Sequence, residues 1–326
     1  MNCLTKMAKK RKRRRKLKVG NLLIVIAVFL LLIGMLVFGV KTLLNLLSPK
    51  TVVKPSENLV INELDYSESE TLDIDLYSEK YMLIRLNDFK VLYEKGSKEK
   101  IYPASLHKVL TMDTVLSNVE SVEETSFITS ADYNRLIEDN ASMAGLDGYK
   151  EYTIEELLYA LILPSGGDAA LALENYFTDK GLNLIDLMNK KCTDLGLVNT
   201  HSTNTTGLHN DNLYTCLNDY ALIVIDTLQN ATAKNVLKTF EYKLDDDTTL
   251  KSTLRTLMNV EEAKVYGGKT GFTGEAGENL MVLFNMNNRS YLLLLANADG
   301  NPYLGQNYHF NDAQNIIEYL YNKQVQ

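Results

Sequence analysis

Cysteine and histidine are scarce in this chain of 326 residues, which has three cysteines and four histidines. Cys3 stands apart, whereas Cys192 and Cys216 can either form one disulfide or remain two separate thiols in helical segments. No CxxC pair occurs, and the histidines lack the spacing of metal ligands: His107, His201, His209 and His309. We therefore expect neither a metal site nor a cofactor.

The chain also lacks internal repeats, low-complexity segments and a Walker phosphate-binding motif. A glycine-rich stretch around Gly268 precedes Lys269 and Thr270, but Ala263 stands where the first Walker glycine is required. The part beyond the stalk, residues 57–326, is long enough to enclose a substantial apolar core.

Acidic residues are absent from the first 18 positions, which carry ten Lys and Arg. Residues 22–40 follow with no charge, and a helix of that length covers about 28 Å, close to the hydrocarbon core of a bilayer. The positive-inside rule predicts a basic cytoplasmic tail over 1–20, a transmembrane anchor over 21–40, a stalk over 41–56 and an outer domain over 57–326. We therefore expect a single-pass protein of the cell membrane with its main domain outside.

A cleaved signal peptide is the alternative to this anchor. Its apolar region would span about 7 to 15 residues and end at an A-x-A-like site. The run here is longer and offers no obvious such site around Gly39 and Val40, which favours an uncleaved anchor.

Charge argues against nucleic acid as a partner. Removing the ten N-terminal positive charges changes the net charge from −7 to −17 for the remainder, because −7 − 10 = −17. An acidic outer domain does not suit a polyanion. The basic tract beside a spanning helix is better explained as a determinant of topology.

The hydrophobic pattern places strands at both ends of the outer domain and helices between them. Strands are predicted over 81–86, 90–93, 265–273, 279–285 and 291–296, and helices over 105–116, 151–163, 168–177, 182–195, 217–229 and 311–321. Such segregation predicts an antiparallel sheet covered by helices, with a helical lobe inserted.

The string from Ser105 to Lys108 reads S-x-x-K. Residues three apart on a helix share a face, so Ser105 Oγ and Lys108 Nζ can meet. A serine hydroxyl needs a base to become a strong nucleophile, and a lysine is such a base only where burial or nearby positive charge lowers its pKa. Taken alone, the string equally fits a helix cap followed by a surface lysine.

A second string, Lys269-Thr270-Gly271, reads K-T-G in a predicted strand. Glycine in a strand marks the close approach of another backbone, and a peptide substrate could pair along such an edge. The Lys269 ammonium and the Thr270 hydroxyl suit a substrate carboxylate. The backbone N–H of Phe272 would complete an oxyanion hole with that of Ser105. Alone, this string also fits a glycine-rich hairpin.

Ser165-Gly166-Gly167 lies between these strings and occupies the place of an S-x-N motif. Ser165 could relay a proton between Lys108 and a leaving amine. The same residues also read as a turn in which Asp168 caps the next helix. The order of the three strings is the signature of the penicillin-binding and serine β-lactamase group.

The chain resembles the serine D-alanyl-D-alanine carboxypeptidases, the low-molecular-mass penicillin-binding proteins. Beyond the three strings, the similarity lies in residues 91–95 and 102–105, 157–159 and 163–170, 195–208, and 268–277. It extends over roughly residues 80 to 300. The fold that this implies is α/β of the α+β type: a β-lactamase/transpeptidase-like antiparallel sheet flanked by helices with an inserted helical lobe, preceded here by one transmembrane helix.

The resemblance implies that Ser105 is the acylated nucleophile, Lys108 its base and Ser165 an aid to proton transfer, with Lys269 and Thr270 holding the terminal carboxylate. The implied substrate is a peptidoglycan stem peptide ending in D-Ala-D-Ala, from which the enzyme releases the last D-alanine. β-Lactams are implied as inhibitors that acylate the same serine. The residues expected to bind substrate are Lys269, Thr270, Gly271, Phe272 and Gly167.

One departure from the family pattern is Gly167, which stands where asparagine is usual. The asparagine amide normally contacts the substrate backbone and orders the lysine. Either water or a neighbour such as Asp168 therefore substitutes for it, or activity is reduced or lost. The alternatives are therefore a catalytically weak wall-binding protein and, within the same fold, a transpeptidase or, less favoured, a β-lactamase.

Overall fold

The computed structural model describes residues 63–254 and 264–325. These residues belong to one compact unit. The predicted tail, the predicted anchor and the stalk lie outside the described residues. Within the described ranges, no helix has both the length and the apolar character needed to cross a bilayer.

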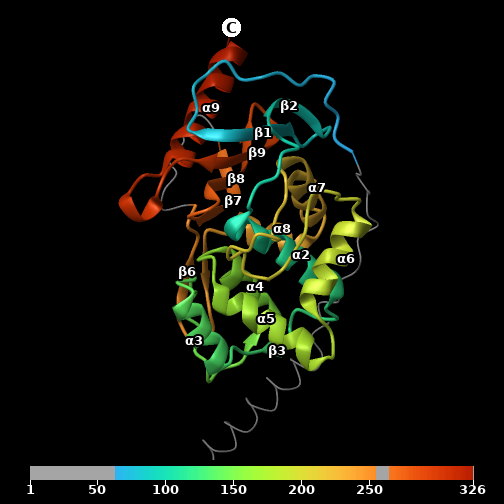
Figure 1. Cartoon of the computed structure of the whole chain (residues 1–326), viewed down its shortest axis with the longest axis vertical. Coiled ribbons are helices and arrows are strands. Elements are labelled where there is room, and N and C mark those ends of the chain that lie inside the picture. The colour runs from blue at the N-terminus through green and yellow to red at the C-terminus, as the bar shows by residue number, and fades with distance from the viewer. Residues whose placement is uncertain (1–62, 255–263, 326) are drawn as a thin grey trace, which may run out of the picture. The chain divides into compact units, whose positions relative to one another are not determined.

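Five strands form one antiparallel sheet in the order β2-β1-β9-β8-β7 (Figure 1). In chain order they are β1 Ser78–Arg85, β2 Lys90–Lys95, β7 Lys264–Thr273, β8 Gly277–Met286 and β9 Arg289–Ala298. The sheet thus joins the beginning and the end of the domain, as predicted. The K-T-G string lies on β7, an edge strand of this sheet, which pairs with β8.

The helices between β2 and β7 form the inserted lobe: α2 Lys108–Asn118, α3 Ser130–Glu138, α4 Ile154–Ile162, α5 Gly167–Asp179, α6 Leu184–Asp194, α7 Leu217–Thr227 and α8 Ala231–Lys238. The predicted capping box at the start of α4 is confirmed, because Thr153 and Glu156 each accept from the other's backbone N–H. The terminal helix α9, Tyr308–Val325, is longer than predicted and follows the short turn η2 Pro302–Leu304.

Two small ladders were not predicted. β3 Thr125–Ser126 pairs with β4 Tyr152–Thr153, and β5 Glu241–Lys243 pairs with β6 Thr249–Lys251. Strands of two or three residues are too short for a period-two pattern to stand out in the sequence.

Alternate residues of the central strands face two separate apolar cores. In β1, Met82 and Ile84 belong to the core shared with α2, α4, α5 and α7, whereas Leu83 packs with Phe310 and Ile317 of α9. This alternation follows from the period of two in a strand, and full burial of each such side chain contributes about 1.5–3 kcal/mol. The sheet is therefore covered by helices on both faces, with α9 on one side and the lobe on the other (Figure 1).

A buried ionic cluster fixes helix α2 against its neighbours. Lys191 Nζ on α6 lies 3.1 Å from Asp113 Oδ2 on α2 and 2.5 Å from Asp226 Oδ2 on α7. Burial, together with the charge of Asp226, raises the pKa of Asp113 to about 7. The shared cation offsets the repulsion between the two carboxylates and thereby ties α2 to both helices.

Cys192 and Cys216 are both free and buried. Cys192 lies in α6, and Cys216 caps α7 by accepting from the backbone N–H of Asp219 at 3.5 Å. Burial raises the pKa of the two thiols, to about 12 and about 11 respectively. Of the two alternatives left open by the sequence, two separate thiols is the one confirmed.

Candidate active site

Ser105 lies in a 3-10 turn, η1 Ala104–His107, directly before α2. The predicted helix start near this serine is right in position, but the first turn is tighter than an α-helix and α2 itself begins at Lys108. The prediction that Ser105 begins an α-helix is therefore wrong: Ser105 lies in the 3-10 turn, and the α-helix begins three residues later. Ala104 has a left-handed backbone with φ 48°, a strained conformation that is frequent at functional sites.

The serine and lysine of the S-x-x-K string are in contact. Lys108 Nζ lies 3.1 Å from Ser105 Oγ, and the lysine is only 3% exposed. Burial lowers the pKa of Lys108 to about 7, against the opposing influence of the Asp168 carboxylate. A substantial fraction of the amine is thus uncharged near neutral pH and able to accept a proton from the serine.

A backbone carbonyl holds the lysine in this position. Lys108 Nζ donates to Thr206 O at 2.6 Å. The loop that carries this carbonyl is ordered by Asn204, whose Oδ1 accepts from Thr206 N and Gly207 N at 3.2 and 2.8 Å. A Cβ at Gly207 would lie 2.1 Å from Ala104 O, so the loop presses directly on the serine turn. Sequence reasoning gave Thr206 no role, because a carbonyl contact leaves no side-chain pattern.

Lys269 belongs to the edge strand β7, and it is buried, with 1% of its surface exposed. Its Nζ donates to Thr270 O at 2.9 Å. Burial lowers the pKa of Lys269 well below its usual value, and the positive charge of Lys108 lowers it further. The charge of Lys108 thus disfavours protonation of Lys269, and a bound anion would stabilise the charged form of Lys269.

Strand β7 approaches the serine turn so closely that any side chain at position 271 would be tightly packed against it. A Cβ there would lie 3.0 Å from Pro103 O and 3.2 Å from Ser105 N. The next residue, Phe272, turns its ring toward Tyr303, with 5.7 Å between ring centroids. Thr270 Oγ1 lies 2.8 Å from Thr253 Oγ1. The structure thus places Gly271 of the K-T-G string against the turn that carries Ser105.

Ser165 stands apart from this hydrogen-bonded pair. It is 5% exposed, and its Oγ has no hydrogen-bond partner among the residues that the structure describes. Its backbone is left-handed with φ 65°. Burying a hydroxyl without a hydrogen-bond partner costs free energy. Together with the strained backbone, this cost indicates that the conformation of Ser165 is kept for function and not for the stability of the fold.

Gly167 opens helix α5, and its backbone N–H donates to Ser142 O at 2.7 Å. A Cβ at this position would lie 3.0 Å from Leu136 Cδ2 and 3.2 Å from Ser142 O. The loop around Ser142 thus packs against the position where the family usually has asparagine.

Asp168, the neighbour named as a substitute for that asparagine, is held in place by backbone donors. Its fully buried carboxylate accepts from the backbone N–H groups of Ala144, Gly145, Leu146 and Ala169 at 2.8 to 3.0 Å. The N-cap of α5 is Gly166, so the alternative reading of Asp168 as the cap is off by two positions. Three of these four donors belong to the 144–146 loop, so the carboxylate ties that loop to the start of α5, while its charge also acts on Lys108.

The fold is that of the DD-peptidases, as comparison with solved structures shows. The crystal structure of the Streptomyces K15 DD-transpeptidase matches with a TM-score of 0.67 and 26% identity, covering 76% of this chain and 98% of that one. A D-alanyl-D-alanine carboxypeptidase from Mycobacterium tuberculosis has the same fold, with a TM-score of 0.67 at 20% identity, 80% of this chain and 96% of that one being covered.

Residues 66–299 match the Peptidase S11 family, described as D-alanyl-D-alanine carboxypeptidase, and the chain belongs to this family. The D-alanyl-D-alanine carboxypeptidase DacF of Bacillus subtilis is 33% identical over 204 residues, 60% of this chain and 51% of the relative. A D-alanyl-D-alanine endopeptidase of Escherichia coli is 25% identical over 255 residues, 76% of this chain and 78% of the relative. The chain spans about half the length of the curated carboxypeptidases that it matches.

Proposed function

We propose that the protein is a D-alanyl-D-alanine carboxypeptidase that removes the terminal D-alanine of peptidoglycan stem peptides through an acyl ester on Ser105. The observation that carries this proposal is the 3.1 Å contact between Ser105 Oγ and the buried amine of Lys108. Family membership supports the class of substrate. β-Lactams are proposed as inhibitors because their strained amide presents a carbonyl to the same nucleophile.

In the first half-reaction, the neutral Lys108 amine takes the proton of Ser105 while Oγ attacks the carbonyl carbon of the penultimate D-alanine. The carbonyl electrons move to oxygen, and the backbone N–H groups of Ser105 and Phe272 are the proposed donors to that oxyanion. Collapse of the intermediate breaks the C–N bond. The departing amine receives the proton from Lys108, with Ser165 as the proposed relay.

In the second half-reaction, a water molecule attacks the ester carbonyl and Lys108 accepts its proton. Collapse then returns a proton to Ser105 Oγ and releases the shortened peptide. Throughout, Lys269 and Thr270 are proposed to hold the terminal carboxylate. Its negative charge would favour the protonated form of Lys269, whose pKa is lowered in the absence of a ligand.

The second candidate reaction is transpeptidation, in which an amine in place of water accepts the acyl group from Ser105. The Streptomyces relative, 98% of whose chain is covered here, is named a DD-transpeptidase. In that reaction an amino group would attack the Ser105 ester and form a new peptide bond. Adding an amino-acid acceptor to the assay distinguishes the two outcomes, because aminolysis yields a product heavier than the hydrolysed peptide.

The test is incubation of the full chain with a peptide ending in D-Ala-D-Ala, followed by mass spectrometry. We expect wild type to release one D-alanine and to bind labelled penicillin covalently. Ser105→Ala should do neither, with a loss of at least about 10³-fold. Binding of muropeptides without release of D-alanine would contradict the proposal and favour the weak wall-binding alternative that Gly167 suggests.

We further propose that residues 21–40 anchor the protein in the cell membrane with the catalytic domain outside. The support is the uncharged run of 19 residues after the basic tract. The full chain should remain in the membrane fraction after a high-salt wash, and added protease should digest its outer domain in intact spheroplasts. Recovery of a shortened, soluble chain would instead support a cleaved signal peptide.

A further inference from the structure

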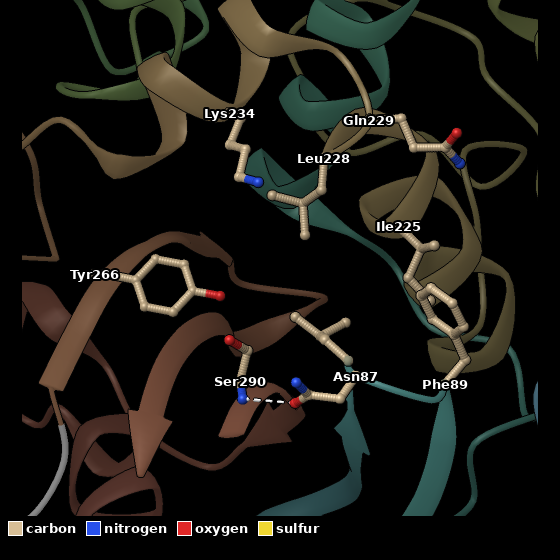
Figure 2. A pocket seen from close by; sticks show the side chains of 9 residues that line it. Asn87, Phe89, Ile225, Leu228, Gln229, Lys234, Tyr266 and Ser290 are labelled. Carbon is tan, nitrogen blue, oxygen red and sulfur yellow. Dashed lines mark hydrogen bonds between the residues drawn. The ribbon is translucent and has the colours of Figure 1, made fainter. Parts of the chain in front are cut away.

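A cavity of about 350 Å³ lies away from the proposed active site (Figure 2). Its walls come from helices α7 and α8, the turn between β1 and β2, and the starts of β7 and β9. Tyr266, which lines it, precedes Gly271 by five residues on β7, or about 16 Å along the strand. None of the predicted catalytic or substrate-binding residues contributes to its lining, so the cavity is a second site.

One side of the cavity is apolar. Phe89 from the β1–β2 turn packs beside Ile225 of α7 in Figure 2, and Leu228 just beyond α7 extends its side chain toward the same space. A volume of this size has room for about a dozen non-hydrogen atoms, at about 30 Å³ for each water-sized group. This wall suits a compact aromatic or branched aliphatic group.

The opposite side is polar and carries a positive charge. Lys234 of α8 directs its ammonium toward the cavity in Figure 2, and the residues that line the cavity include no carboxylate. In residues 63–254 and 264–325, no carboxylate lies within ion-pair distance of Lys234. Lys234 is exposed, and an ammonium without an ion-pair partner at the mouth of a half-apolar cavity suits an anionic ligand.

Hydrogen-bond donors converge near this cation. The Tyr266 hydroxyl points toward the Ser290 side chain and hydrogen-bonds with it (Figure 2), while burial raises the pKa of Tyr266. Asn87 Oδ1 accepts from Ser290 N at 2.9 Å, which leaves the Asn87 amide NH₂ as the group that can donate to a ligand. Lys234 is the one ammonium in the lining, and Lys238 Nζ lies 5.0 Å from the Tyr266 ring centroid, so the positive charge here suits the carboxylate of a small ligand.

We propose that this cavity binds a small monocarboxylate with a compact apolar body. The carboxylate lies at Lys234 with the Asn87 amide as a donor and Tyr266 beside it, and the apolar body rests on Phe89, Ile225 and Leu228. This proposal does not depend on the proposed peptidase reaction, because the two sites share no residue.

The experiment is photolabelling of the full chain in detergent with 4-azidobenzoate and with its neutral isostere, 4-azidobenzamide. Labelled peptides are mapped by mass spectrometry. We expect the acid to label the segment from Ile225 to Lys234, or the segment around Tyr266, at about tenfold lower concentration than the amide. Ser105→Ala should label as wild type does, which separates this site from the catalytic one.

Two variants and a control make the result specific. Lys234→Gln should reduce labelling by the acid to the level of the amide, whereas Lys251→Gln, which removes an exposed lysine of β6 outside the cavity, should leave the preference unchanged. Leu228→Trp fills the cavity and should block both probes. Equal labelling by acid and amide, a preference that survives Lys234→Gln, or labelling confined to other segments would overturn the proposal.

Discussion

Lys108→Met is expected to lower the rate at which a penicillin acylates Ser105 by about 10³-fold at pH 7.5. The change removes the amine that lies 3.1 Å from Ser105 Oγ but keeps a side chain of similar length in a buried site. General bases typically contribute 10²–10⁴-fold, and here no other base contacts the serine among the hydrogen bonds of the described residues. The measurement is the rate of covalent labelling by a fluorescent penicillin.

The fold should survive this substitution. A buried amine is costly to desolvate, so methionine should leave the melting temperature equal or raise it. A melting curve and the circular dichroism spectrum provide the control. If the folded Lys108→Met variant were acylated within tenfold of the wild-type rate, Lys108 would not be the base.

Gly271→Val is expected to lower the acylation rate by about 100-fold. The new side chain would begin 3.0 Å from Pro103 O, 3.1 Å from Leu106 N and 3.2 Å from Ser105 N. These are backbone atoms that cannot rotate away, so strand β7 must move from the serine turn. A displacement of about 1 Å at a catalytic group can cost 10²-fold in rate. Gly271→Ala should have a smaller effect, about tenfold, because its single methyl group needs less room.

Gly274→Ala is the matched control for this prediction. It makes the same type of change just beyond the end of β7, where an added Cβ meets no atom within 4 Å. It should acylate at the wild-type rate. A wild-type rate for Gly271→Val would show that the close approach of β7 does not position the site.

The sequence was sufficient to predict the helices and strands whose hydrophobic pattern is strongly periodic. The strands β8 and β9 alternate between the two cores over ten residues each, and α4 begins with a capping box, so the hydrophobic pattern and the cap both identify them. The contact between Ser105 and Lys108 was also predictable, because the spacing of three survives the tighter geometry of a 3-10 turn.

Other features depend on tertiary contacts that leave no local pattern. The Thr206 carbonyl reaches Lys108 across 98 positions of the sequence, and a carbonyl has no residue-specific signal. The hydrogen bonds from the backbone of residues 144–146 to the Asp168 carboxylate likewise form only in the folded chain. The cavity proposed as a second site is lined by residues from five separate elements. Neither its volume nor the place of Lys234 in its lining could therefore be inferred from the sequence.

Burial keeps the Lys108 amine uncharged often enough to deprotonate Ser105, and the whole proposed reaction depends on this. The most direct test is the second-order rate constant for acylation by benzylpenicillin, measured across the range of pH in which the protein remains folded. Because the folded pKa of Lys108 is lowered to about 7, the rate should rise with pH through a midpoint near 7 and then level off, falling about tenfold per pH unit well below it. A rate that is independent of pH through this range, or one that rises only near the ordinary pKa of lysine, would contradict the account.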